Sequence, residues 1–187
     1  MRKLLTLVVL LLTGCSTGSD AVDVSNGGEF RFVAGTPGGE VIDESDRASA
    51  PAFSAVLLDG SDFDSSTLSG DVVVINFWGS WCAPCRLETP EFQRVYDEVS
   101  AEDVSFLGVN VKDDRQLAQA FLEDNGITYP SVFDPRGEIA LAFRDYPANA
   151  IPSTIILDRD GRVAAVYVAV VEADELRSVV DTLVAQG

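Results

Sequence analysis

The chain has 187 residues, and nearly half of them are apolar, which is enough for one domain with a substantial core and excludes a disordered protein. Its formal net charge is −17 at pH 7. A surface this acidic repels nucleic acid and anionic lipid headgroups, so neither is an expected partner.

The first residues have the features of a bacterial lipoprotein signal. Arg2 and Lys3 precede an apolar run over 4–12, which spans only about 14 Å of helix and is too short to cross a membrane. Residues 12–15, Leu-Thr-Gly-Cys, resemble the lipobox, whose cysteine is lipidated and becomes the new N-terminus. The resemblance implies a diacylglycerol on Cys15 that holds the protein at a membrane surface. An ordinary secretory cleavage that leaves Cys15 free is the alternative.

This interpretation divides the chain into three parts. Residues 1–14 are a signal peptide, and residues 15–47 are the lipid anchor and a flexible tether rich in Gly, Ser, Asp and Thr. The alternation around Phe30 and Phe32 indicates a short strand, by which part of the tether docks on the domain. Residues 48–187 form the domain.

The segment before the cysteine pair predicts a hairpin and then a buried strand. Within 50–69, two short apolar runs flank Asp59-Gly60, a pair of residues typical of a hairpin turn. Residues 71–78 are apolar on both faces and rich in β-branched side chains, as expected for a central strand covered by helices.

The rest of the chain alternates between helices and strands. Apolar residues recur at helical spacing after the cysteine pair, up to Val99, and again over 176–184 at the end of the chain. Between these helices we expect a strand over 104–111, a helix over 115–126, a short helix over 137–146 and two strands within 153–170. The order predicts an α/β fold in which helices flank a central mixed β-sheet, with the hairpin as an N-terminal extension.

Cys82 and Cys85 stand where the strand gives way to a helix. Cys82 is expected near the N-cap and Cys85 one turn further in, on the same helix face, at a separation of about 5 to 6 Å that a disulfide can bridge. The free amides and the positive end of the helix dipole favour a thiolate at Cys82. We therefore expect an exposed Cys82 that attacks a substrate disulfide and a buried Cys85 that resolves the mixed disulfide.

A metal site and a purely structural disulfide are the alternatives for this pair. Zinc takes four protein ligands, or three and a water, and these are usually Cys and His. The chain has no histidine, and its one other cysteine is the expected lipid anchor, Cys15. Closing a loop of about four residues stabilises by only roughly 2 kcal/mol, which a core of this size does not need. We therefore expect no metal and no other cofactor.

The sequence around the pair, Ile-Asn-Phe-Trp-Gly-Ser-Trp-Cys-Ala-Pro-Cys, is similar to the thioredoxin-fold active site, with Trp81 before the first cysteine. Pro90 stands eight residues after Cys82, where thioredoxins carry a helix proline. The segment Ala-Ile-Pro-Ser-Thr resembles the one that carries their cis-proline. The match implies a cis bond between Ile151 and Pro152, and substrate contacts from both residues and from Trp81.

Over roughly 48–186, these motifs and the lipobox together resemble the membrane-tethered TlpA/ResA-type thiol-disulfide oxidoreductases. Where cytosolic thioredoxin has a buried proton-handling aspartate, this chain has Asn76, which cannot exchange a proton. Glu88 lies three residues after Cys85 on the same helix face, and ResA-type proteins have a functional glutamate at the matching position. We expect Glu88 to handle the proton of Cys85. An exposed helix residue without such a role is the alternative.

The resemblance implies an extracytoplasmic reductant, anchored to the outer face of the cell membrane and kept reduced by a membrane thiol carrier. Its implied substrate is a protein disulfide, with the Cys-x-x-Cys-His haem-attachment site of an apocytochrome c as the leading candidate, which points to cytochrome c maturation. The alternatives are a disulfide-forming oxidant and a general thiol-disulfide exchanger of secreted proteins. The stability of the dithiol decides the direction, and a sequence gives no reduction potential.

Overall fold

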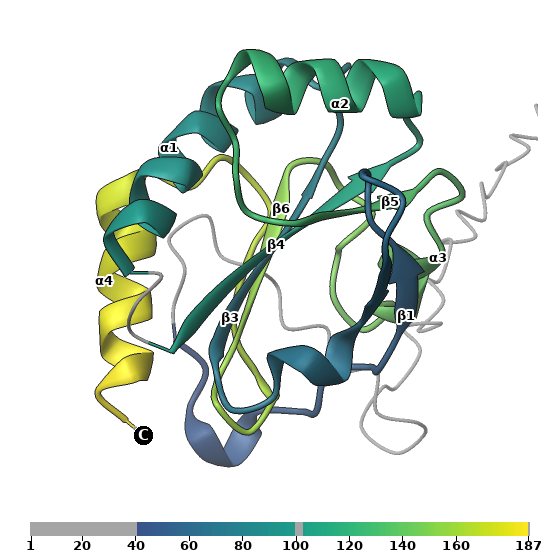
Figure 1. Ribbon diagram of the computed structural model, residues 1–187. Helices are drawn as coiled ribbons and strands as arrows, with labels where there is room; N and C mark the ends of the chain where they lie inside the picture. Colours follow the sequence, from purple (N-terminus) through teal and green to yellow (C-terminus); the bar gives the residue numbers. More distant parts are fainter. Residues whose placement is uncertain (1–40, 100–102, 187) are drawn as a thin grey trace, which may run out of the picture. The chain divides into compact units, whose positions relative to one another are not determined.

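A five-stranded sheet forms the centre of the domain in the computed structural model, which describes residues 41–99 and 103–186 (Figure 1). The strands are β3 (Val72–Trp78), β4 (Val104–Val111), β5 (Ser131–Asp134), β6 (Ser153–Leu157) and β7 (Val163–Tyr167). They lie in the order β5-β4-β3-β6-β7. β3, β4 and β5 pair in parallel, whereas β6 pairs antiparallel with both β3 and β7. The predicted mixed sheet is confirmed.

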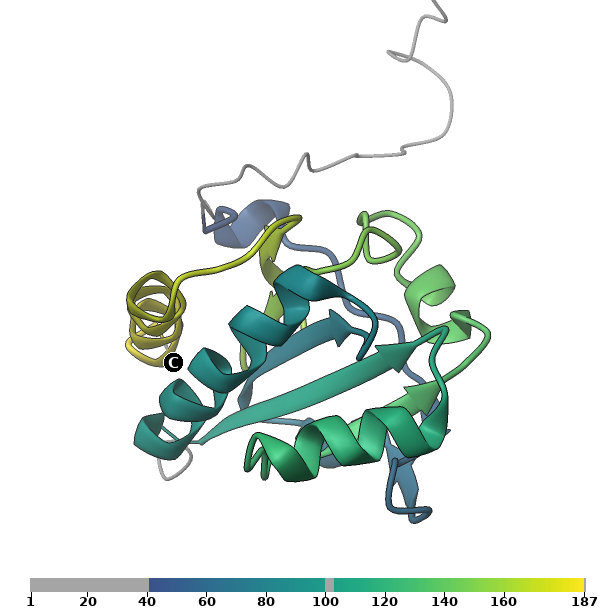
Figure 2. The same cartoon turned by 90° about the horizontal axis from the view of Figure 1, so that it is seen from above.

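Helices cover both faces of this sheet, as predicted. α1 (Ala83–Val99) and α4 (Ala173–Val184) lie side by side on one face, and α3 (Glu138–Ala142) lies on the other side of the strands (Figure 2). The remaining elements are the hairpin β1 (Ser54–Val56) and β2 (Asp62–Asp64), the helix α2 (Arg115–Asp124) and the 3-10 helices η1 (Glu44–Asp46) and η2 (Ser65–Leu68).

The central strand β3 explains why the sheet is apolar on both sides. All seven of its residues are buried, and its apolar side chains up to Phe77 alternate between two cores. Val72 and Val74 face the cluster that contains Phe92 of α1. Val73, Ile75 and Phe77 face the cluster that contains Phe143, and residues of the hairpin pack against this cluster. β3 is therefore packed on both faces, and the cysteine pair follows the C-terminal end of this well-packed strand.

Three features differ from the sequence-based expectations. β5 was not predicted, because its four residues lie between Pro130 and Pro135 and are too few for a clear periodicity. The expected helix over 137–146 is shorter, since α3 ends at Ala142. α2 ends at Asp124, two residues before the predicted end, and Gly126 then adopts a positive φ of 64°.

The first described residues contact the domain. The Ile42 amide donates to the Ala164 carbonyl of β7 at 2.7 Å. Arg47 is buried, and its guanidinium donates to the Asp158 carboxylate at 3.1 Å and to the Ile42 carbonyl at 2.9 Å. Contacts with the domain thus begin at least six residues before position 48.

The expected signal peptide, the lipidated Cys15 and the short strand around Phe30 lie outside the residues that the structure describes. Within 41–99 and 103–186, none of the helices is long and apolar enough to span a membrane.

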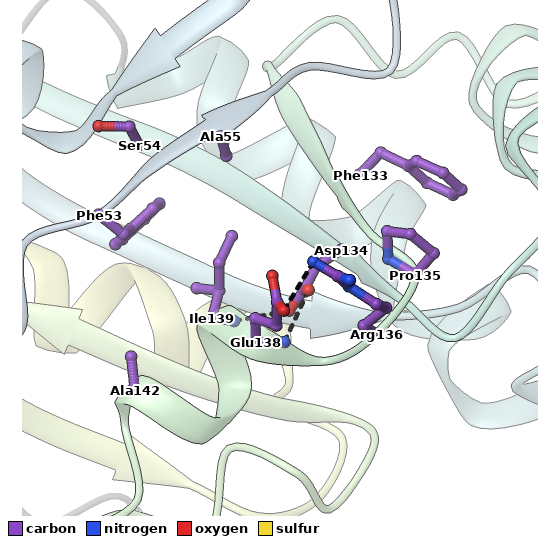
Figure 3. A pocket seen from close by; sticks show the side chains of 10 residues that line it. All are labelled: Phe53, Ser54, Ala55, Phe133, Asp134, Pro135, Arg136, Glu138, Ile139 and Ala142. Carbon is purple, nitrogen blue, oxygen red and sulfur yellow. Dashed lines mark hydrogen bonds and ion pairs between the residues drawn. The ribbon is translucent and has the colours of Figure 1, made fainter.

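An open cavity of about 450 Å³ lies between the hairpin and α3 (Figure 3). Its walls come from β1, β5 and α3, and include Phe53, Ala55 and Ile139. The buried Asp134 carboxylate accepts hydrogen bonds from the amides of Glu138 and Ile139, and so begins α3. Neither cysteine of the pair lines this cavity, which is therefore separate from the site described below.

Gly108 in the middle of β4 provides a test of this packing. A Cβ at this position would lie 2.5 Å from Ser131 Oγ and 2.9 Å from Trp78 Nε1, two atoms that hydrogen-bond to each other at 3.0 Å. Gly108→Ala is therefore expected to lower the free energy of unfolding by about 1 to 3 kcal/mol in urea denaturation. The exposed Leu117→Ala is the control, with an expected change within about 0.5 kcal/mol. A loss for Gly108→Ala no larger than that of the control would contradict the packing.

Candidate redox site

A disulfide joins Cys82 and Cys85 at the C-terminal end of β3. Cys82 directly precedes Ala83, the first residue of α1, and Cys85 is the third residue of the helix. Their Cα atoms are 5.3 Å apart, within the range predicted from the spacing. The two sulfurs can therefore form or break their bond without a large movement of the backbone.

Both cysteines are buried in this oxidised form. Cys85 is 0% exposed and Cys82 only 4%, so the prediction of an exposed Cys82 is wrong for the disulfide state, although the expected ranking holds. The apolar cluster around the pair consists of Leu58, Trp78, Ala118 and Phe121, with Ile151 packed against it. Leu58 follows β1, and Ala118 and Phe121 belong to α2. These elements are remote in sequence from the cysteine motif, so the motif alone does not predict that they pack around the disulfide.

The start of α1 directs a hydrogen-bond donor at the first sulfur. The Cys85 amide donates to Cys82 Sγ at 3.2 Å. The same amide is placed to stabilise a thiolate on Cys82 when the disulfide is reduced, together with the positive end of the helix dipole. The structure thus supports the predicted location of Cys82 at the helix N-terminus.

Hydrogen bonds from Ser80 and Trp81 fix the turn before Cys82. The amide and the hydroxyl of Ser80 both donate to the Asp113 carboxylate, at 2.6 and 2.8 Å. Trp81 is 56% exposed, and its indole N–H donates to the Val111 carbonyl at 3.3 Å. A Cβ at Gly79 would lie 2.6 Å from this indole nitrogen, so only glycine leaves room for the ring. The exposed Trp81 is therefore held in a defined position beside the disulfide.

Glu88 lies one turn after Cys85 and is 1% exposed, which excludes the alternative of an exposed helix residue. Its carboxylate accepts hydrogen bonds from the Val171 amide at 2.8 Å and from Asn76 Nδ2 at 3.0 Å. Burial raises the pKa of Glu88 to about 7, although both hydrogen bonds act in the opposite direction. A carboxyl group with this pKa can gain and release a proton near neutral pH.

The segment before β6 completes the site. The Ile151–Pro152 peptide bond is cis, as predicted. Ser153 pairs with Phe77 near the C-terminal end of β3, which places this bond at the same end of the sheet as the disulfide. Pro90 lies within α1, also as predicted.

Several residues of the site were not predicted from the sequence. The Val171 amide bonds to Glu88 through its backbone, which leaves no signal in the side-chain pattern. Thr154 on β6 is 0% exposed and bonds to Asn76; it lies in the segment that resembles the cis-proline motif, but no role was predicted for it. Asp113 was detectable in principle, because it follows a parallel strand at the sheet edge where functional residues gather.

Comparison with known proteins identifies relatives of this chain. The family model described as Redoxin matches residues 45–183. Sporulation thiol-disulfide oxidoreductase A of Bacillus subtilis is 28% identical over 149 residues, which cover 78% of this chain and 88% of the relative. Thiol-disulfide oxidoreductase ResA of Geobacillus kaustophilus is 30% identical over 129 residues, which cover 69% of this chain and 72% of the relative.

Solved structures show the same fold. A DsbF homologue from Corynebacterium diphtheriae superposes with a TM-score of 0.73 and 37% identity, covering 78% of this chain and 93% of that structure. A secreted thiol-disulfide isomerase from Corynebacterium glutamicum gives a TM-score of 0.74 and 37% identity, covering 79% and 92%.

The raised pKa of Glu88 predicts a pH-dependent stability. Between pH 4.5, the ordinary pKa of a glutamate, and about 7, the folded chain holds a proton at Glu88 that the unfolded chain releases. The free energy of unfolding should therefore fall as the pH rises through this window, by about 3 kcal/mol in total. Glu88→Gln lacks this contribution. Urea denaturation of both oxidised chains should show it as a difference that changes with pH, and a difference independent of pH would contradict the assignment.

Proposed function

The chain belongs to the Redoxin family and is a ResA-type thioredoxin-like thiol-disulfide oxidoreductase, and we propose that it acts as a reductant of protein disulfides outside the cytoplasm. The observation that carries the proposal is that the ionisable residue one turn after Cys85 on α1 is a buried glutamate. This arrangement supports the proposed exchange step and its proposed direction.

In the proposed reaction the reduced chain reaches the substrate through Cys82. Its thiolate attacks a substrate disulfide, which forms a mixed disulfide and releases the first substrate sulfur as a thiolate that water protonates. Glu88 then takes the proton of the Cys85 thiol. The Cys85 thiolate attacks Cys82 Sγ, the Cys82–Cys85 disulfide forms, and the second substrate sulfur leaves as a thiolate and is protonated. The substrate gains two electrons and the chain loses two.

The surroundings of the pair favour the reducing direction. Strong disulfide-forming oxidants owe their potential to a stabilised thiolate in the reduced form. Here only Ala83 and Pro84 separate the cysteines, and the buried ionisable group beside them is an acid. Arg86 is exposed, with its guanidinium 5.8 Å from the centre of the Phe121 ring, so water screens its charge. The thiolate is therefore stabilised mainly by the helix N-terminus.

We assign substrate contact to the exposed Trp81 and to the backbone of Ile151 and Pro152. These groups border the disulfide on two sides, from the turn before α1 and from the segment before β6. A Cys-x-x-Cys-His segment of an apocytochrome c is the substrate that the likeness to ResA-type proteins supports. Reduction of this segment before haem attachment would place the protein in cytochrome c maturation.

The proposed location is the outer face of the cell membrane. The lipobox-like sequence before Cys15 supports a lipid anchor, and the Corynebacterium glutamicum relative is a secreted protein. A membrane thiol carrier would then be the electron donor that returns the Cys82–Cys85 pair to the dithiol form.

A second candidate function is general thiol-disulfide exchange, or disulfide formation, in secreted proteins. It is favoured by the two corynebacterial structures at 37% identity, one a DsbF homologue and the other described as a thiol-disulfide isomerase. The same residues would act in it, and only the direction of electron flow would differ.

Reduction of a synthetic Cys-x-x-Cys-His peptide in its disulfide form tests the proposal. The reduced chain should convert the peptide to its dithiol in a stoichiometric single turnover, followed by thiol alkylation and mass spectrometry. Glu88→Gln should fold normally and slow the step by about tenfold or more near pH 7, because the proton acceptor of Cys85 is lost.

Three variants control this assay. Cys82→Ser should abolish the reaction, whereas Cys85→Ser should stop it at a mixed disulfide between Cys82 and the peptide. The exposed Glu91→Gln, one turn beyond Glu88 on α1, should react like the unaltered chain. If Glu88→Gln matched the unaltered chain from about pH 5 to about pH 9, the role of Glu88 would be excluded.

A further inference from the structure

The side chain of Asn76 has a buried oxygen with no hydrogen-bond partner among the described residues. Asn76 lies in the middle of β3 and is 1% exposed. Its Nδ2 donates to Glu88 Oε2 at 3.0 Å and to Thr154 Oγ1 at 3.1 Å. Both hydrogen bonds of the amide thus use its nitrogen. The oxygen is removed from water without gaining a hydrogen bond, which is unfavourable.

This arrangement fits only one protonation state of Glu88. As a carboxylate, Glu88 accepts from two donors, Asn76 Nδ2 and the Val171 amide. When Glu88 takes a proton, its hydroxyl needs an acceptor, yet both neighbouring groups are donors. A buried hydroxyl that faced a donor would oppose the proton transfer that the site is built to carry out.

We propose that Asn76 is a positioning residue whose side-chain amide turns by half a rotation about χ2 when Glu88 becomes protonated. In the turned form Oδ1 accepts from the Glu88 hydroxyl and from the Thr154 hydroxyl, which can serve as donor or acceptor. The oxygen then has two donors, and the Nδ2 hydrogens take the place where the oxygen had no partner among the described residues, so the gain at the Glu88 hydroxyl must exceed the cost at the amide nitrogen. No covalent bond changes, and the proton stays on Glu88.

The inference rests on the proposed role of Glu88 as the proton acceptor of Cys85. The titratable groups that face Glu88 are Cys85 on α1 and Tyr129 before β5, while β3, β6 and the segment before α4 contribute Asn76, Thr154 and the Val171 amide. In the oxidised chain Cys85 cannot titrate. Burial, helped by the charge of Glu88, raises the pKa of Tyr129, which therefore keeps its proton at neutral pH. Glu88 alone then changes charge in this pocket.

The test is NMR spectroscopy of the oxidised full chain, with the Asn76 side-chain amide and the Glu88 carboxyl carbon followed over pH. The amide resonances should shift with the midpoint of Glu88, and the nuclear Overhauser contacts from the Asn76 amide protons to Thr154 should be lost on the acidic side. Glu88→Gln should abolish the pH dependence of the Asn76 amide resonances and of their contacts to Thr154. A shift without loss of the contacts to Thr154 would mean that the amide senses the charge but does not turn, which would overturn the inference.

Asn76→Leu gives an independent readout, because leucine has a similar size and can neither donate nor accept. If the amide turns, it stabilises both forms of Glu88, and its removal should move the pKa of Glu88 by only a few tenths of a unit. If the amide only donates to the carboxylate, its removal should raise that pKa by about one unit or more. The larger rise would contradict the inference. The NMR experiment on the unaltered chain stands if this variant does not fold.

The two proposals fail separately. Unchanged peptide reduction by Glu88→Gln would reject the proton-acceptor role, whereas the coupled behaviour of Asn76 and Glu88 is measured in the oxidised chain, where no exchange takes place. A fixed Asn76 amide would reject the rotation and leave the role of Glu88 unaffected.

Discussion

The burial of one carboxyl group beneath the disulfide is the constraint on which the site depends. Glu88 is buried between the sheet and the segment before α4, and among the residues that the structure describes it accepts two hydrogen bonds. That desolvation brings its pKa to about 7, where a proton can move either way under physiological conditions. Asn76 donates to this buried carboxyl group, and the proposed rotation of its amide accommodates the proton.

The fold supplies the remaining conditions through ordinary packing. β3 is covered on both faces, so its C-terminal end fixes the turn that carries Trp81 and the start of α1. The helix N-terminus directs an amide at Cys82 Sγ, and Ile151 of the cis bond before β6 packs against the cluster that contains both cysteines. The proposed roles of the cysteines rest on these positions: Cys82 stands at the start of the helix, and Cys85 stands one turn before the buried Glu88.

Local signals in the sequence predicted much of this arrangement. β-branched runs identified β3 and β4, the two-residue spacing of the cysteines predicted their pairing, and the likeness to thioredoxins located the cis bond at Pro152. Features that depend on contacts between distant segments were missed. Leu58 and α2 cover Cys82, and a backbone amide at Val171 binds Glu88, so neither could be read from residues near the motif. β5 was missed for a different reason, its short length.

The direction of electron flow is the central claim, and the reduction potential of the Cys82–Cys85 pair tests it most directly. The full chain can be equilibrated with glutathione or dithiothreitol buffers at pH 7 and its thiols counted by alkylation. A buried acid beside Cys85 and a thiolate stabilised mainly by the helix N-terminus predict a potential below about −200 mV, in the range of reductants. A potential near the roughly −120 mV of a strong disulfide-forming oxidant would contradict the account.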